Sequence, residues 1–465
     1  MNLKKVIILV TSIIGFVFAD CQNIYIDIKG ENIRNKNVRL TYISDRISLM
    51  EKPLANKYLD SNTSSVSFSA TLDETKEMIV KIDMREYHFL AKPGNKYFLD
   101  IEPFNDSVFK FDYKEILPCK LGMQHYDSIN TPINDVDTVF DDFLRDNSRM
   151  LYVKDSSAKD SLYSIERYLL EKYKDNDYML NYIKYEFAGI KYGFSLESKK
   201  KIKDSLFANS PILYDNIGYM DCLNTIFAHY FTRGYKFIKR IDIENWLDDG
   251  NYNAFNDALG RDKVLSNEVF RELVFLLGMK DAYLEGYFNR KRILSMIKNF
   301  ENLTKFQQHK NIAKNLVEYL ISRDFSGKKI ADYKLKDIKG DDVMISSFAD
   351  KPLIICFVKL DSTPSLKELE TIHYFYDSIK NNCNILTVCC DNNYEKMYNF
   401  VRNNKVGNKY KWPFVYFNYN WEMTEAYQLH FFPTFVLVNQ DGTIGQNPMA
   451  SPSENGLKQF FNKKK

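Results

Sequence analysis

The segment FVKLDSTPSLKEL, residues 357–369, contains the side chains of greatest chemical interest in this chain. Its pattern predicts the end of a buried strand, a sharp turn and the start of an amphipathic helix. Ser362 and Ser365 flank Pro364 in the turn, where the positive end of the helix dipole acts on nearby side chains. That position lowers the pKa of a thiol toward neutrality, but a serine hydroxyl is far too weak an acid and forms no disulfide.

A serine nucleophile at this turn would need a neighbouring base. His373 is eleven residues beyond Ser362, which places it about 16 Å along a helix at a rise of 1.5 Å per residue. His430 is a second candidate, but no oxyanion or triad arrangement is visible. The simpler interpretation is that Ser362 or Thr363 caps the helix and that Pro364 occupies its first turn.

The cysteines and histidines show no spacing typical of a redox or metal site. Seven cysteines and six histidines occur, without a CxxC, HxxxH or HxH pattern. We therefore expect no metal site and no cofactor. Cys356, Cys389 and Cys390 lie within apolar runs, where a free cysteine is commonly buried as a small hydrophobic side chain.

The first 19 residues have the pattern of a secretory signal peptide. Lys4 and Lys5 give a positive start, residues 6–18 form an apolar run, and Ala19 ends a cleavage-like site. The apolar run is too short for a comfortable membrane span. We therefore expect cleavage after Ala19 and an exported protein, in the periplasm or associated with the outer membrane.

Cys21 provides an alternative, a lipoprotein anchored through this cysteine. The lipoprotein pattern requires a small residue immediately before the cysteine, and Asp20 is not one. Plain secretion is therefore the preferred interpretation. No later segment is apolar enough to span a bilayer.

The composition is that of a globular protein with several domains. The 465 residues are enough for about two to four domains. Hydrophobic residues make up 45% of the chain and charged residues 27%, so real cores can be buried. The net charge is +3 with acids and bases mixed along the chain, which argues against a nucleic-acid partner.

The pattern of hydrophobic residues changes twice along the chain. Residues 20–105 contain short alternating runs separated by Gly, Asn, Asp and Pro, which predicts a β-sandwich-like domain. Its predicted strands are Ile24–Gly30, Asn37–Ser44, Ser64–Leu72, Met78–Met84, Tyr87–Gly94 and Lys96–Glu102. Residues 106–325 repeat apolar residues every three or four positions, which predicts an α-helical domain.

Residues 326–465 predict a mixed α/β sandwich. PLIICFV and NILTVCC are continuous apolar runs, as expected for central strands that are covered on both faces. Hairpins are predicted at Gly340 and at Asp441–Gly442. The predicted fold class is thus multidomain α+β, with an N-terminal β-sandwich, a central α-helical segment and a C-terminal α/β domain.

The order of these last elements resembles the thioredoxin fold, and more closely the TlpA and ResA-like branch of envelope thiol-disulfide reductases. The residues that carry the resemblance are Gly327 with Ala331-Asp332-Tyr333, the ISSF of Ile345–Phe348, and Pro433-Thr434 followed by Asp441-Gly442. The resemblance extends from Ser326 to Lys465.

The resemblance implies that the two redox cysteines of the family align with Ser362 and Ser365. The proline and the glutamate of the family motif persist as Pro364 and Glu368. Pro433 is then the cis-proline that faces the turn. The resemblance therefore implies a redox site that has lost both sulfur atoms, so we do not expect thiol-disulfide exchange there.

We expect the thioredoxin-like domain to bind or scaffold a protein or peptide partner in the cell envelope. The expected binding residues are Ser362, Thr363, Pro364, Phe432, Pro433 and Thr434. The alternative hypothesis is a thiol-disulfide oxidoreductase that uses cysteines outside a CxxC motif, such as Cys356 or the pair Cys389-Cys390. A third hypothesis places the function in the helical domain, for which the sequence offers no chemistry.

Overall fold

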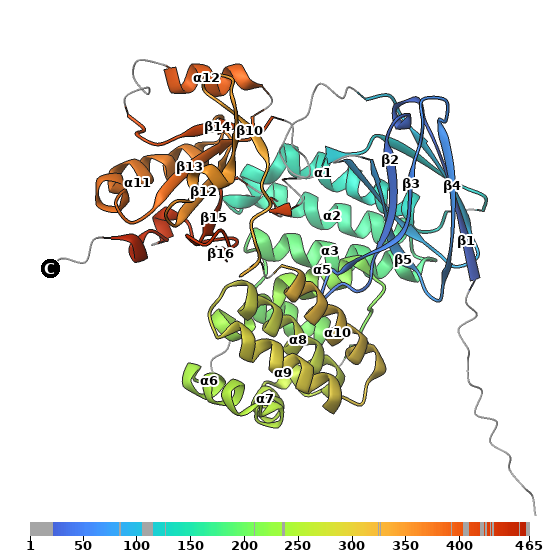
Figure 1. The fold of residues 1–465 in the computed structure, drawn as a ribbon. Coiled ribbons are helices and arrows are strands. Elements are labelled where there is room, and N and C mark those ends of the chain that lie inside the picture. Colours follow the sequence, from blue (N-terminus) through green and yellow to red (C-terminus); the bar gives the residue numbers. More distant parts are fainter. Residues whose placement is uncertain are drawn as a thin grey trace, which may run out of the picture.

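The computed structural model describes residues 22–82, 85–104, 115–125, 127–208, 210–234, 238–323, 325, 327–391, 393–402, 409–418, 423, 426–427, 429, 432–454 and 456–461. N-terminal β sheets, a central helical segment and a C-terminal α/β domain follow one another along the chain (Figure 1). This architecture confirms the predicted fold class. The predicted signal peptide and Cys21 lie outside the described residues.

The N-terminal part consists of two β sheets that share one core. One sheet has the strand order β4-β1-β7-β9 and the other β3-β2-β5-β6-β8. The strands are β1 (Gln22–Lys29), β2 (Asn37–Ile43), β3 (Glu51–Tyr58), β4 (Ser65–Leu72), β5 (Lys76–Ile82), β6 (Arg85–Ala91), β7 (Lys96–Ile101), β8 (Glu115–Ile116) and β9 (Cys119–Met123). Alternate residues of β1, such as Ile24 and Ile26, are buried in the same cluster as Leu40 and Val80 of the other sheet, as in a β-sandwich.

This β part continues past residue 105, where we expected it to end. β8 pairs with β6, and β9 pairs antiparallel with β7, with Met123 opposite Tyr97. The helices begin only at Asn130. β3 was also missing from the predicted strands, because this edge strand contains Pro53 and is mostly exposed, so that its sequence shows no alternation.

The central part is helical. Its α-helices are α1 (Asn130–Tyr152), α2 (Ser156–Lys172), α3 (Asp177–Gly193), α4 (Lys199–Ile202), α5 (Ile217–Ile226), α6 (Arg240–Asp249), α7 (Tyr252–Leu259), α8 (Glu268–Leu284), α9 (Arg290–Leu303) and α10 (Gln307–Ser322). Asp155, Asn176 and Asn267 cap α2, α3 and α8 with side-chain hydrogen bonds to backbone N–H groups. Apolar residues of α8, α9 and α10 form the largest core of the molecule with those of α5.

The loop between β2 and β3 joins the β part to the helical part. Ile47 in this loop is fully buried within the helical core. Lys280 of α8 donates a hydrogen bond from Nζ to the carbonyl oxygen of Ile47 at 2.9 Å. Asn224 of α5 donates to the carbonyl oxygen of Arg46 at 3.0 Å. The loop therefore fixes the β part to at least two helices of the next part.

The C-terminal part is a seven-stranded sheet with the order β11-β10-β14-β13-β12-β15-β16. β12, β13 and β14 are parallel, and β15 is antiparallel to β12. The elements are β10 (Lys334–Asp337), β11 (Asp342–Met344), β12 (Leu353–Val358), α11 (Thr363–Ile379), β13 (Asn384–Cys389), α12 (Tyr394–Arg402), β14 (Phe414–Tyr416), β15 (Thr434–Val438) and β16 (Ile444–Gln446). Gly340 and Gly442 have φ values of 86° and 76° at the two predicted hairpin turns, a backbone region that favours glycine.

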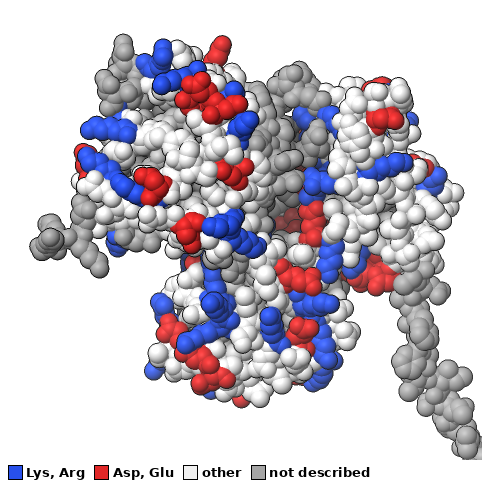
Figure 2. All heavy atoms as spheres, in the orientation of Figure 1, with Lys and Arg blue, Asp and Glu red and all other residues white. Residues whose placement is uncertain are grey.

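Charges are mixed over the surface. Figure 2 shows Lys and Arg interspersed with Asp and Glu on one face of all three parts, in keeping with the small net charge of +3. Within the described part of the chain, no helix combines the length and the apolar character that crossing a membrane requires.

Candidate functional site

The turn after β12 begins at the end of a fully buried strand. All six residues of β12 are buried, as expected for a central strand that is covered on both faces, and β13 pairs with one edge of this strand and β15 with the other. α11 begins at Thr363, with Ser362 at the N-cap position and Pro364 in the first turn. The strand, turn and helix predicted from the sequence are therefore confirmed.

Ser365 is a buried residue of this turn. Its side chain is 0% exposed, and its Oγ accepts a hydrogen bond from the backbone N–H of Lys359 at 3.4 Å. Ser362 holds the predicted cap position without the expected side-chain hydrogen bond. One reason is that Pro364 removes one of the two N–H groups that a cap side chain normally reaches. The turn is closed instead by the N–H of Ser362, which donates to the carbonyl oxygen of Lys359 at 3.2 Å.

Asp391, directly after β13, fixes the other side of the turn. Its carboxylate accepts the backbone N–H of Leu360, with distances of 3.0 and 3.2 Å to its two oxygens. Lys396 of α12 bridges two acids, with Nζ 2.6 Å from Asp391 and 2.8 Å from Asp361. Burial raises the pKa of Asp391 although Lys396 opposes this effect. The hydrogen bond from Lys396 lowers the pKa of Asp361.

The segment from Phe432 to Thr434 lies beside this turn. Thr434 is opposite Phe357 in the antiparallel pairing of β12 with β15, so the residues before Thr434 run next to those that follow Phe357. The peptide bond between Phe432 and Pro433 is cis. Phe432 and Pro433 are half-buried, whereas Thr434 is only 3% exposed. Strand pairing thus brings both halves of the predicted groove together, with Thr434 largely covered.

None of the cysteines that the structure describes lies within the turn itself. The six that the structure describes are free, and all except the half-buried Cys119 are buried. Burial raises the pKa of Cys356 and of Cys389 well above the ordinary thiol value, and it raises the pKa of Cys383 to about 12. Thiol-disulfide exchange requires a thiolate, so the buried positions disfavour this reaction.

The histidines provide no base for Ser362 within the described residues. His373 lies in α11 with its ring edge-on to Tyr410, at 5.9 Å between ring centres. His430, the second candidate, lies outside the described residues. In the part of the chain that the structure describes, no three His, Cys, Asp or Glu side chains are grouped as metal ligands would be.

Comparisons with known proteins agree with the fold of the C-terminal part. Residues 350–444 match a family described as thioredoxin-like. A thiol:disulfide interchange protein from Bacteroides sp. is similar at 22% identity and a TM-score of 0.27, over 30% of this chain and 92% of that one. The thioredoxin domain of a thiol-disulfide oxidoreductase from Bacteroides vulgatus is similar at 21% identity and a TM-score of 0.25, over 30% and 98%. No curated protein matches the chain.

The C-terminal part is therefore a thioredoxin-like domain. The family match, the parallel strands β12 to β14 and the antiparallel β15 describe one fold. Sequence reasoning named Ser362, Ser365 and Pro433 as residues of this region but missed Asp391, for which the available signal was an acid placed directly after a buried strand.

Proposed function

We propose that this chain is an exported protein whose thioredoxin-like domain is redox-inactive and binds a protein or peptide partner in the cell envelope. The signal-like first 19 residues support export. Anchoring through Cys21 is the alternative to free secretion. The proposed binding surface is formed by residues 362–364 and 432–434.

The observation that carries this proposal is the position of Ser365. It occupies the first turn of α11, is 0% exposed, and accepts a backbone hydrogen bond from within the turn. A hydroxyl at this place preserves the geometry of the turn but cannot transfer electrons through a disulfide. Ser362, Thr363 and Pro364 remain half-buried or exposed, so a partner can still contact the turn.

The alternative function, thiol-disulfide exchange through other cysteines, has less support. Cys356 is in the middle of β12, and Cys389 ends β13, so both side chains are covered by the domain core. A thiol there would have to become exposed and ionised before it could react.

Restoring the two sulfur atoms tests the redox part of the proposal. We expect the double variant Ser362→Cys/Ser365→Cys to form a disulfide that dithiothreitol reduces and to gain insulin-reduction activity, while the natural chain has none. The single variants S362C and S365C are matched controls, because neither can close a disulfide within the turn. Insulin reduction by the natural chain that is lost in Cys356→Ala or Cys389→Ala would instead establish the alternative.

Partner capture from envelope extracts tests the binding part. Phe432→Ala should reduce the capture of a partner that the natural chain retains. Tyr152→Ala, at a position that is 79% exposed in α1, is the matched control. Capture that is unchanged in Phe432→Ala and Pro433→Ala would contradict the groove. Mass analysis of the mature N-terminus distinguishes cleavage after Ala19 from lipidation of Cys21.

A further inference from the structure

Strand β4 forms one edge of the sheet with the order β4-β1-β7-β9. Its eight residues, Ser65–Leu72, pair antiparallel with β1 along their whole length. Among the residues that the structure describes, no strand pairs with the other side of β4. An edge strand of this kind presents a row of N–H and C=O groups to which another chain can add as a further strand.

The hydrogen bonds between β1 and β4 show which backbone groups of β4 point away from the sheet. Where this pairing continues past β4, the N–H of Gly30 donates to the carbonyl oxygen of Ser64 at 2.9 Å. Bonded and non-bonded pairs alternate in an antiparallel ladder, so every second residue from Val66 to Leu72 bonds to β1. The residues that direct their N–H and C=O groups away from β1 are Ser65, Ser67, Ser69 and Thr71.

These outward backbone groups have no hydrogen-bond partner within the described part of the chain. The hydroxyl groups of the same residues do not reach them either. Ser67 donates from its hydroxyl to Asp27 at 2.6 Å, and Thr71 donates to Asn23 at 2.9 Å, so both hydroxyls bond to side chains of β1.

The other sheet edges of the described chain are protected in ways that β4 lacks. β3 contains Pro53 with Lys52 and Lys57, and the five residues of β9 include Lys120. β8, β11 and β16 have two or three residues each. β4 is eight residues long and contains neither a charged residue nor a proline. Because short length, lysine and proline are the usual protection of an edge, their absence indicates that the edge of β4 is used for pairing.

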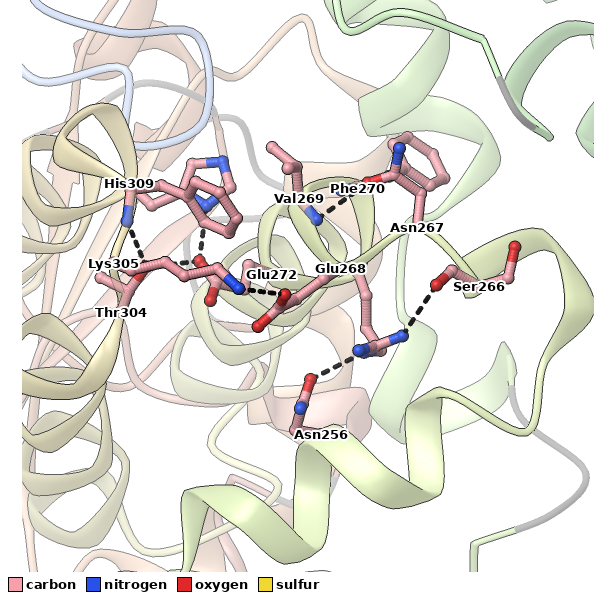
Figure 3. A network of polar contacts seen from close by, with 12 residues as sticks. Asn256, Ser266, Asn267, Glu268, Val269, Phe270, Glu272, Thr304, Lys305 and His309 are labelled. Carbon is pink, nitrogen blue, oxygen red and sulfur yellow. Dashed lines mark hydrogen bonds and ion pairs between the residues drawn. The ribbon is translucent and has the colours of Figure 1, made fainter.

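Buried polar groups in the helical part show the contrasting arrangement, in which the partners come from the same chain. Thr304 donates to Oε2 of Glu272 at 2.6 Å, and Nδ1 of His309 lies 2.7 Å from the same oxygen. Figure 3 shows these three side chains pointing toward one another. The backbone groups along β4 are instead open to a partner from outside.

We propose that β4 pairs antiparallel with β4 of a second copy of this chain, which joins the two four-stranded sheets into one. With Ser67 of one copy opposite Ser69 of the other, Ser65 lies opposite Thr71, and every outward residue then has a backbone partner. The same register places Phe68 opposite its own copy on the inner face. This dimer does not involve the thioredoxin-like domain and does not depend on its proposed function.

The neutral and alternating sequence of β4 favours a second copy as the partner. In a two-fold pairing each strand meets its own sequence, so charged residues near the axis would face like charges, and β4 has none. Both faces match as well, because exposed hydroxyl side chains meet hydroxyl side chains, and buried apolar side chains meet apolar ones. The neighbouring charges are already paired, with Lys96 2.8 Å from Asp27 and Lys29 3.2 Å from Asp100.

Sedimentation equilibrium of the chain from Asp20 onward tests the proposal, in dithiothreitol so that Cys21 cannot link two copies. We expect a dimer that dissociates on dilution, because one pair of strands is a small interface. A chain that stays monomeric up to millimolar concentration would overturn the proposal.

Hydrogen exchange locates the contact. Deuterium uptake by peptides that cover residues 65–72 should slow as the dimer forms, whereas uptake by residues 51–58 of β3, the protected edge, should not change. A dimer without slower uptake in β4 would show that the two copies meet elsewhere, which contradicts the proposal.

Lysine variants test the register. Ser67→Lys/Ser69→Lys places lysines opposite one another and should raise the dissociation constant of the dimer by about tenfold or more. Ser161→Lys/Ser164→Lys adds the same charge at two exposed positions of α2 and should leave the dimer intact. Equal weakening in both double variants would show a non-specific charge effect and overturn the proposal.

Ser69→Pro tests the backbone contact without adding charge. Because the N–H of Ser69 points away from β1, a proline there keeps the ladder with β1 and removes one donor from the edge. It should weaken the dimer as well, and circular dichroism checks that the variants fold. If Ser69→Pro does not fold, the lysine variant decides, and an unchanged dimer in that variant would refute the pairing.

Discussion

A buried carboxylate is one of the groups that hold the turn after β12. The side chain of Asp391 has 0% exposure and accepts the N–H of Leu360, while Lys396 supplies the opposite charge. Removing this carboxylate leaves a buried donor without an acceptor and a half-buried ammonium with one partner fewer. An unsatisfied buried group costs more than the net gain from one hydrogen bond.

We expect Asp391→Ala to lower the free energy of unfolding of the thioredoxin-like domain by about 2–4 kcal/mol. Asp391→Asn should cost roughly half as much, because an amide oxygen can still accept from Leu360. Urea unfolding followed by fluorescence in a Trp246→Phe background measures this domain, since the remaining tryptophans are Trp412 and Trp421. Equal losses in both variants would show that the charge matters more than the hydrogen bond.

His88 makes the stability of the β part depend on pH. Burial lowers the pKa of His88, but hydrogen bonds with Glu77 and Glu86, at 2.7 and 3.3 Å, outweigh burial and raise the pKa to about 9. The unfolded value is about 6.5. The stabilisation is therefore complete below about pH 6.5 and is lost as the pH rises to about 9.

We expect His88→Gln to remove this decline of the melting temperature between about pH 6.5 and 9. Thermal unfolding across that range, followed by circular dichroism, measures the effect. His125→Gln changes an exposed histidine and should retain the decline. The same pH dependence in His88→Gln and in the natural chain would contradict the assignment.

At the scale of residues, local motifs could be predicted and distant partners could not. Ser362 and Ser365 were found because the strand, the turn and the helix start are contiguous in the sequence. Asp391 was missed because Leu360 lies 31 positions away, and only the pairing of β12 with β13 brings the two residues together.

At the scale of elements, the packing of α8 makes one of its glycines sensitive to substitution. A Cβ atom at Gly278 would lie 2.5 Å from Cδ2 of Phe231, whose ring is 1% exposed. Beyond its sequence neighbours and the backbone of its own helix, Gly189 of α3 has no heavy atom of the described residues within 4 Å of the corresponding position. The two glycines therefore form a matched pair of helical sites with opposite surroundings.

We expect Gly278→Ala to lower the free energy of unfolding by about 1–3 kcal/mol, because the added methyl group overpacks the core. Gly189→Ala should raise it by about 0.5–1 kcal/mol, since alanine loses less backbone entropy in a helix. Chemical denaturation followed by the helical circular dichroism signal compares the two. A gain of stability in both variants would show that the ring of Phe231 moves aside.

The elements that could be predicted were those with a clear period or a continuous apolar run. β12 and β13 are buried runs that the sequence shows directly. β3 could not be predicted, because an edge strand with Pro53 has few buried positions. β9 was missed for a related reason, since its five residues, Cys119–Met123, are mostly exposed or half-buried.

At the scale of the whole molecule, the loop around Ile47 links the stability of the β part to that of the helical part. We expect Ile47→Ala to lower the free energy of unfolding by about 2–4 kcal/mol. It should also increase hydrogen exchange in both the loop and α8, because the carbonyl of Ile47 accepts from Lys280.

Ile116→Ala is the control for this prediction. It changes a residue of the same β part that is 80% exposed and should leave hydrogen exchange in α8 unchanged. Faster exchange in Ile47→Ala that is confined to the loop would show that the two parts open independently.

The order of the three parts could be predicted from the sequence, but the contact between the β part and the helical part could not. Each part has its own spacing of hydrophobic residues, so a change in that spacing indicates where one part ends and the next begins. The contact between the two parts depends on interactions such as the hydrogen bond from Lys280 to Ile47, two residues that are 233 positions apart. The spacing of hydrophobic residues gives no information about such a distant pair.

The alkylation rates of the buried thiols measure how often the surrounding parts of the molecule open. Cys222 is buried in the helical part, and Cys356 with three further cysteines is buried in the thioredoxin-like domain, whereas Cys119 of the β part is only half-buried. An alkylating reagent reaches a covered thiol only when the surrounding part opens. The labelling rate of each buried cysteine therefore reports how often its own part opens, and the unmodified protein can reveal whether the helical part or the thioredoxin-like domain opens first.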